Sequence, residues 1–112
     1  MRFPTSPLTI IPHLDPRKDV GPFVQALLQL PPNSTLMAAG TWCTWPEWIQ
    51  KWGQILGINT SYKQVTLADF EKWMPGGLGQ ELGDMFEFST ELFDRGDPNV
   101  LKATDLEKVS VL

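Results

Sequence analysis

Two polar residues fall within the apolar side of a predicted helix, where they could perform acid–base chemistry on a bound molecule. The helix is predicted over residues 78–93, because its apolar residues recur at helical spacing: Leu78, Leu82, Met85, Phe86, Leu92 and Phe93. Glu81 lies at the edge of this stripe, and partial desolvation there would favour its protonated form, which suits a general acid. Ser89 lies in the middle of the stripe, where its hydroxyl either bonds to the preceding turn or faces a ligand. The structural alternative is a glutamate that reaches water and a serine that bonds only to the backbone.

A glycine-rich segment, residues 76–83, has some features of a phosphate-binding loop. Gly77 and Gly79 match the first two positions of a dinucleotide fingerprint, but Leu82 takes the place of the third glycine. The segment also follows a predicted helix, whereas the fingerprint follows a strand. We therefore interpret it as a break between two helices, and we expect no cofactor there.

Nucleophilic and metal chemistry have little support in the sequence. Cys43 and His13 are the only cysteine and histidine, so an internal disulfide is excluded and a zinc site is not expected. The two could in principle form a nucleophile and its base, but a buried structural cysteine is the simpler interpretation. Tyr62 and Lys63 are neighbours in a predicted strand and would point to opposite faces, so they cannot form a proton-relay pair.

Length and composition indicate a single globular domain over residues 1–112. The hydrophobic content of 42% and charged content of 20% argue against disorder. A net charge of −4 gives no attraction to phosphate backbones, so we expect no nucleic-acid partner. The absence of a long apolar run predicts no signal peptide and no membrane partner, and hence a cytoplasmic location.

A tryptophan-rich helix over residues 45–56 is the strongest structural signal. Thr44 and Glu47 form a capping box at its start, and Gly57 suits the left-handed residue that ends it. One stripe carries its apolar residues: Trp45, Trp48, Ile49, Trp52, Ile55 and Leu56. Indoles bury large areas, so this helix is expected to be covered and to form the hub of the core.

The remaining elements alternate between strands and helices. Strands are predicted at residues 8–11, 35–39 and 59–65 and helices at 19–30 and 67–74, with residues 1–7 irregular and at most a helical turn at 104–107. Together these elements predict a small α/β fold, or an α+β arrangement, with about three short strands and four helices. Trp42 and Trp73 lie on or near loops and are the better candidates for a pocket wall.

The order and spacing of several motifs resemble the C-terminal half of NmrA-like proteins, which are atypical members of the short-chain dehydrogenase superfamily. The resemblance covers about residues 8–107. It rests on four segments: residues 18–24, with Pro31-Pro32 after them; Leu36 to Gly40; Thr44-Trp45-Pro46-Glu47-Trp48; and residues 70–86, with Gly96-Asp97-Pro98 closing it.

The family's N-terminal Rossmann half, which carries the glycine motif, has no counterpart in this sequence. The resemblance therefore implies no NAD(P) site and no NAD(P)-dependent oxidoreductase activity. Without that half, apolar surface on the helices from Asp19 and from Leu78 would be exposed. We expect a second copy to cover it in a homodimer, with a ligand cavity in or beside the interface.

The resemblance and the residues together favour a cofactor-independent enzyme of fungal-type secondary metabolism. It would act on a hydrophobic aromatic small molecule by acid–base cyclisation, intramolecular addition or isomerisation. Glu81 is the first candidate for the catalytic acid or base and Asp84 the second, with Tyr62 or His13 as partners. The residues expected to line the cavity are Trp42, Trp73, Met85, Phe88 and Ser89. The alternative is a non-catalytic regulatory module that binds other proteins, as some NmrA-like proteins do.

Overall fold

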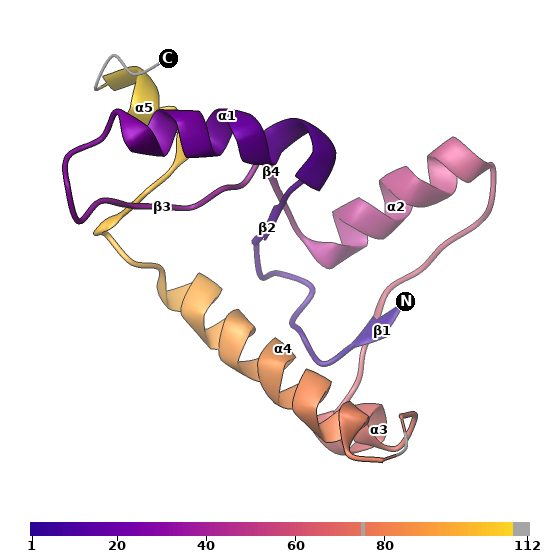
Figure 1. Ribbon diagram of the computed structural model, residues 1–112. Helices are drawn as coiled ribbons and strands as arrows, with labels where there is room; N and C mark the ends of the chain where they lie inside the picture. The colour runs from indigo at the N-terminus through magenta and orange to yellow at the C-terminus, as the bar shows by residue number, and fades with distance from the viewer. Residues whose placement is uncertain (75, 109–112) are drawn as a thin grey trace. The chain divides into compact units, whose positions relative to one another are not determined.

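The computed structural model describes residues 1–74 and 76–108 and shows a small mixed α/β fold (Figure 1). The chain divides into two compact units, and each unit draws on two separate stretches of sequence. The first unit contains residues 1–11 and 43–96, and the second contains residues 12–42 together with the described residues from 97 onward. The predicted α/β class is confirmed, although the strands are shorter and more numerous than the sequence indicated.

The first unit holds one pair of strands and three helices: β1 (Arg2–Phe3), α2 (Trp45–Leu56), β5 (Lys63–Gln64), α3 (Leu67–Glu71) and α4 (Leu78–Arg95). Strand β1 runs parallel to β5, with Arg2 opposite Lys63 and Phe3 opposite Gln64. The expectation of an irregular N-terminus is therefore wrong for β1, because its backbone finds pairing partners some 60 residues away along the chain.

The second unit contains α1 (Pro16–Leu28), β3 (Thr35–Leu36), β6 (Val100–Leu101) and α5 (Ala103–Lys108). It also contains most of β2 (Ile11–His13) and β4 (Thr41–Cys43), each of which has one residue in the first unit. Strand β2 pairs with β4, and β3 runs parallel to β6. The N–H of Met37 extends the second pairing by donating to the Leu101 carbonyl at 2.8 Å.

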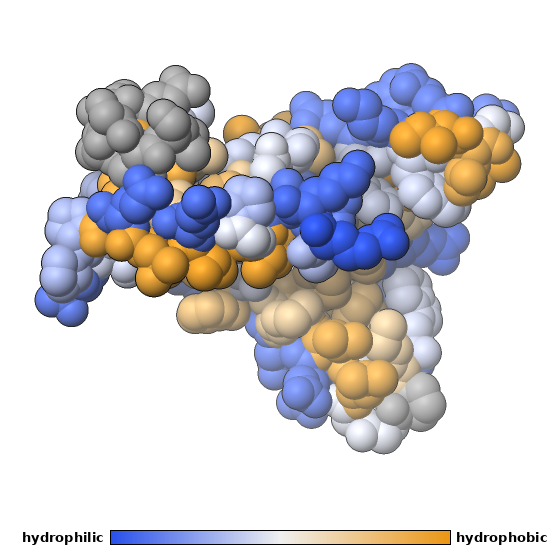
Figure 2. Space-filling model, turned by 45° about the horizontal axis from the view of Figure 1, so that its top comes forward, coloured by the Kyte–Doolittle hydropathy of each residue, from blue (hydrophilic) through white to orange (hydrophobic). Residues whose placement is uncertain are grey.

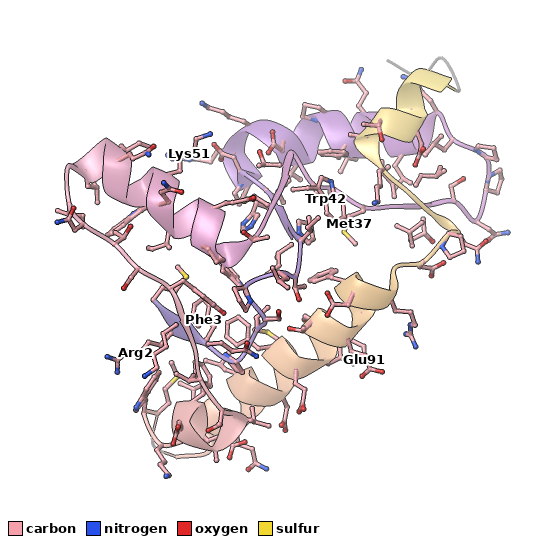
Figure 3. All side chains as sticks on the ribbon, turned by 180° about the vertical axis from the view of Figure 1, so that it is seen from behind. Arg2, Phe3, Met37, Trp42, Lys51 and Glu91 are labelled. Atoms are coloured by element: carbon pink, nitrogen blue, oxygen red, sulfur yellow. The ribbon has the colours of Figure 1, made fainter. Side chains whose placement is uncertain are left out.

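The side chain of Phe3 is the centre of the core of the first unit (Figure 3). Its ring lies 4.6 Å from that of Phe86, 5.1 Å from that of Trp45 and 6.3 Å from that of Phe70, measured between centroids. Strand β1 thus contacts α2, α3 and α4 through one side chain. The hub of this core is a phenylalanine in the lead-in segment and not the tryptophan helix that the sequence favoured.

Helices α3 and α4 approach closely because two glycines of α4 face α3. A Cβ atom at Gly79 would lie 2.5 Å from the carbonyl oxygen of Glu71, and one at Gly83 would lie 2.5 Å from Cδ1 of Leu67. Both glycines are buried, as is Phe70 of α3. This contact orients α4, because it determines which side of the helix is covered and which remains exposed.

The local prediction for α2 is confirmed in detail. The Glu47 N–H donates to Thr44 Oγ1 at 3.3 Å, and the Thr44 N–H donates to Glu47 Oε2 at 3.0 Å. Gly57 ends the helix with a left-handed φ of 70°. The apolar stripe, however, is covered on one edge only: Ile49 is buried, whereas Trp52 is 42% exposed and Ile55 is 78% exposed.

Two other boundaries differ from the sequence prediction. Helix α1 begins at Pro16 and is capped by Asp15, whose carboxylate accepts the Arg17 N–H. Asp19, the first residue of the predicted helix, lies inside the first turn and accepts the Asp15 N–H at 2.9 Å, so both aspartates bind backbone N–H groups at the helix start. The strand expected at residues 8–11 lies at Ile11–His13 instead, and Leu8 is 85% exposed in a turn.

Candidate functional site

Helix α4 brings four of the predicted site residues onto one exposed flank. Met85 is 49% exposed and Phe88 is 66% exposed. Glu81, one helical turn before Met85, is exposed on the same flank, and Ser89 is half-buried at its edge. Phe86 and Thr90 lie on the opposite side of the helix, where Phe86 contacts Phe3 and the Thr90 hydroxyl lies 3.3 Å from that of Thr5. The predicted clustering of polar and apolar groups is therefore present, on an open helix surface.

The exposure of Glu81 corrects one part of the sequence argument. Its carboxylate was expected to be partly desolvated, but the residue is exposed, because α3 packs against the glycine side of α4 and leaves this edge uncovered. Asp84 is exposed as well. Neither carboxylate makes a side-chain hydrogen bond or ion pair with another described residue. Their proposed catalytic roles stay predictions.

Trp73 lies beyond the end of α3 and is 47% exposed. Its ring centroid is 6.2 Å from that of Phe70, and the guanidinium carbon of Arg2 lies 5.8 Å from the ring. The indole is thus held between a core phenylalanine and a cation, which suits a partly exposed aromatic wall.

Tyr62 has a structural environment that opposes a catalytic role. Its hydroxyl donates to the carbonyl oxygen of Thr5 and lies 3.4 Å from that of Phe3, so it joins the segment after α2 to the N-terminal strand. Burial raises the pKa of Tyr62 to about 12. At neutral pH the group is a protonated donor, and a general base would need the ionised form.

His13 and Trp42 belong to the second unit, and the remaining predicted site residues belong to the first. The His13 carbonyl accepts the Gly40 N–H at 2.9 Å. Trp42 is half-buried, and the ammonium group of Lys102 lies 4.6 Å from the centroid of its ring. Trp42 and Met37, both labelled in Figure 3, belong to this second unit.

Cys43 is half-buried, and its environment holds the thiol in the protonated form. Burial raises the pKa of Cys43, the negative charge of Glu47 raises it further, and Lys51 opposes this only in part. A nucleophilic role needs the thiolate, so the structural interpretation of this cysteine is the better supported one. Within the described part of the chain, no three His, Cys, Asp or Glu side chains gather closely enough to bind a metal ion.

Two features of this structure are not marked by any pattern in the sequence. Thr5 and Thr9 are buried hydroxyl residues, each 2% exposed, and the Thr9 hydroxyl has no hydrogen-bond partner among the described residues. No periodicity marks them, because they lie in an irregular segment. The other feature is the extent of exposed apolar surface.

Exposed apolar side chains line one flank of each long helix, and Figure 2 shows them over α1 and at the end of α2. These residues are Val20, Val24, Leu27 and Leu28 on α1, Trp48, Trp52, Ile55 and Leu56 on α2, and Leu78, Met85 and Phe88 on α4. Their spacing is the same helical repeat that predicted burial. The helical repeat therefore predicted correctly which residues form the apolar side of each helix. It did not predict which of those residues are buried and which are exposed.

The chain was compared with protein-family models, curated proteins and solved structures. No protein-family model matches the chain, and no curated protein or solved structure matches it. The resemblance to NmrA-like proteins is tested by none of these comparisons and stays a prediction. Among residues 1–74 and 76–108, no helix has the length and apolar character needed to cross a membrane.

Proposed function

We propose that this chain is a non-catalytic, NmrA-like protein-binding module. The observation that carries the proposal is the exposure of one apolar flank on each of α1, α2 and α4. Proteins rarely leave large contiguous apolar patches in water unless the patch is an interaction site. Two of these residues are the tryptophans Trp48 and Trp52 of α2, which are 37% and 42% exposed.

The environment of the candidate catalytic groups also supports a binding module over an enzyme. Glu81 and Asp84 are exposed carboxylates, and the phenol of Tyr62 is engaged by backbone carbonyls. A general acid for a hydrophobic substrate works best where water is excluded. An open helix flank does not exclude water, but it is well shaped for the side chains of another helix.

Site-specific photo-crosslinking in cells tests the proposal. A crosslinking amino acid is placed at Phe88, Ile55 or Leu28, which are respectively 66%, 78% and 81% exposed on α4, α2 and α1. Lys63, an exposed residue of β5, is the matched control position. We expect discrete protein adducts from at least one flank and none from Lys63. Equal crosslinking at all four positions, or none at any flank, would contradict the proposal.

We propose a homodimer as the oligomeric state, formed through α1. Val20, Val24 and Leu27 recur with offsets of four and seven residues and are 41%, 51% and 43% exposed. Such an uncharged stripe can pack against its own copy across a two-fold axis. Val24→Asp should convert a dimer to a monomer in light scattering, with Gln25→Asp as the control. A wild-type monomer would refute this assignment.

The second candidate function is the cofactor-independent enzyme acting on a hydrophobic aromatic molecule. The observation that favours it is the position of Glu81 within the apolar flank of α4, one helical turn from Met85 and two from Phe88. Native mass spectrometry of the chain purified from its source would reveal a retained small molecule. If that molecule is converted equally by wild type, Glu81→Gln and Asp84→Asn, the catalytic assignment is wrong.

A further inference from the structure

We propose that the exposed flank of α4 docks a cationic amphipathic helix of another protein. This inference rests on the proposed binding function and names the partner chemistry for one of its surfaces. The apolar part of the flank is formed by Leu78, Met85 and Phe88, which are 50%, 49% and 66% exposed. The polar part is a row of exposed carboxylates along the same helix.

The orientation of α4 determines that this flank is available. Gly79 and Gly83 face α3, and Phe86 contacts Phe3, so one side of the helix is committed to the core of its unit. Met85 and Phe88 lie outside that side and are a single helical turn apart, with Leu78 two turns before Met85. These three side chains follow one side of the helix, with the exposed carboxylate of Glu81 between Leu78 and Met85, and a second helix can pack along this side.

The charge of the flank specifies the partner. Helix α4 contains five carboxylates and one arginine, so its formal charge of −4 equals that of the whole chain. Asp84, Glu87 and Glu91 follow one another at offsets of three and four residues, and all three are exposed. Figure 3 shows Glu91 projecting from α4 on the side away from Phe3.

None of these carboxylates is neutralised within the described residues. Lys72 and Asp69 form an ion pair at 3.7 Å, outside α4, and Arg95 lies in the last turn of α4 without a pairing carboxylate among the described residues. Like charges three or four residues apart destabilise a helix, so the row has an electrostatic cost as it stands. A partner that brings Lys or Arg side chains removes this repulsion and gains attraction at the same time.

A second copy of α4 does not fit this surface, because two helices of charge −4 would repel each other. The complementary ligand is a helix with apolar side chains at offsets of three, four and seven residues and with Lys or Arg at the margins of that stripe. Met85 suits such a role because its flexible thioether adapts to different apolar neighbours. Phe88 is the most exposed of the three and is the expected anchor.

The test uses synthetic helical peptides of about 18 residues, the length of α4, in calorimetric titrations against the full chain. The first peptide has leucine at offsets of three, four and seven residues and lysine at all remaining positions. The second peptide has glutamate in place of each lysine. The third has the composition of the first in a scrambled order. We expect binding of the leucine–lysine peptide alone. Phe88→Ser should weaken it about tenfold, whereas Ile55→Ser on α2 should leave it unchanged.

Charge is tested separately with Asp84→Asn/Glu87→Gln/Glu91→Gln, a triple variant that keeps the apolar stripe. We expect it to weaken binding about fivefold or more at low ionic strength, and to match the wild type at about 1 M salt, where the screening length is ~3 Å. Circular dichroism is used to check that each variant keeps its helices.

The outcomes separate the inference from the proposed function. Binding that is lost with Ile55→Ser but not with Phe88→Ser would overturn the α4 assignment and leave a binding module with a different surface. Equal affinity for the acidic and basic peptides would overturn the charge argument. If Phe88→Ser instead turns a dimer into a monomer, the flank is covered by a second copy and the inference is wrong. If no peptide binds and crosslinking finds no partner, both proposals fail.

Discussion

Tyr62 offers a test of the core of the first unit, because it is the only tyrosine in the chain. Its phenol donates to the Thr5 carbonyl, and burial raises the pKa of Tyr62 from 10.0 to about 12. Tyrosinate absorbs in the near ultraviolet where neutral tyrosine and tryptophan absorb little. A pH titration of this absorbance therefore reports on one identified group, and we expect a midpoint about two pH units above that of a free tyrosine.

The same shift predicts how stability depends on pH. The pKa of Tyr62 is higher in the folded chain than in the unfolded chain, so the unfolded state releases the proton first as pH rises. The stabilisation is therefore complete below about pH 10 and is lost as pH rises from about 10 to about 12. Two pKa units correspond to at most about 2.7 kcal/mol. Because Tyr62 is only half-buried and partly screened by solvent, we expect about 1 kcal/mol.

The assay combines the absorbance titration with urea unfolding at several pH values. Tyr62→Phe is the matched control: it lacks the absorbance change, loses the pH-dependent step, and should cost about 1 kcal/mol at neutral pH because a carbonyl loses its donor. A titration midpoint near pH 10 in the folded protein would refute the reasoning. So would a pH-dependent step of equal size in Tyr62→Phe.

Three further predictions concern packing, capping and reactivity. Gly79→Ala should destabilise the chain by about 1–3 kcal/mol in urea unfolding, since its Cβ would meet the Glu71 backbone at 2.5 Å. Gln80→Ala, at the exposed neighbouring position of α4, should instead change stability by less than about 0.5 kcal/mol; equal effects would contradict the packing argument. Thr44→Ala should cost about 1 kcal/mol of stability by removing the α2 cap, and no change in unfolding midpoint would show that the capping box is dispensable. Cys43 should react with a thiol reagent more slowly than a free cysteine at pH 8, because its pKa is raised; faster labelling would contradict this.

Local sequence signals predicted both ends of α2. The start and end of α2 agree with the structure because the capping box of Thr44 and Glu47 and the left-handed Gly57 are interactions among near neighbours. The Thr66 hydroxyl caps α3 through a similar near-neighbour contact, because it accepts the Asp69 N–H at 3.1 Å. Such signals need no knowledge of the rest of the chain.

The short strands were harder to predict, because their partners are distant in sequence. Strand β1 exists through pairing with β5, and β6 exists through pairing with β3. Two-residue strands carry too little periodicity to be recognised, so only the folded chain reveals them. Phe3 shows the same limit: nothing around it in the sequence marks the ring that contacts α2, α3 and α4.

The candidate site shows the same division between local and tertiary information. The sequence by itself determined that Glu81, Met85, Phe88 and Ser89 share one side of a helix, since helical geometry repeats every 3.6 residues. Only the tertiary structure decided that this side is open, because Gly79 and Gly83 admit α3 on another side and turn the flank outward. Periodicity states which residues lie together, whereas the atoms packed against a helix decide which of its apolar residues are buried.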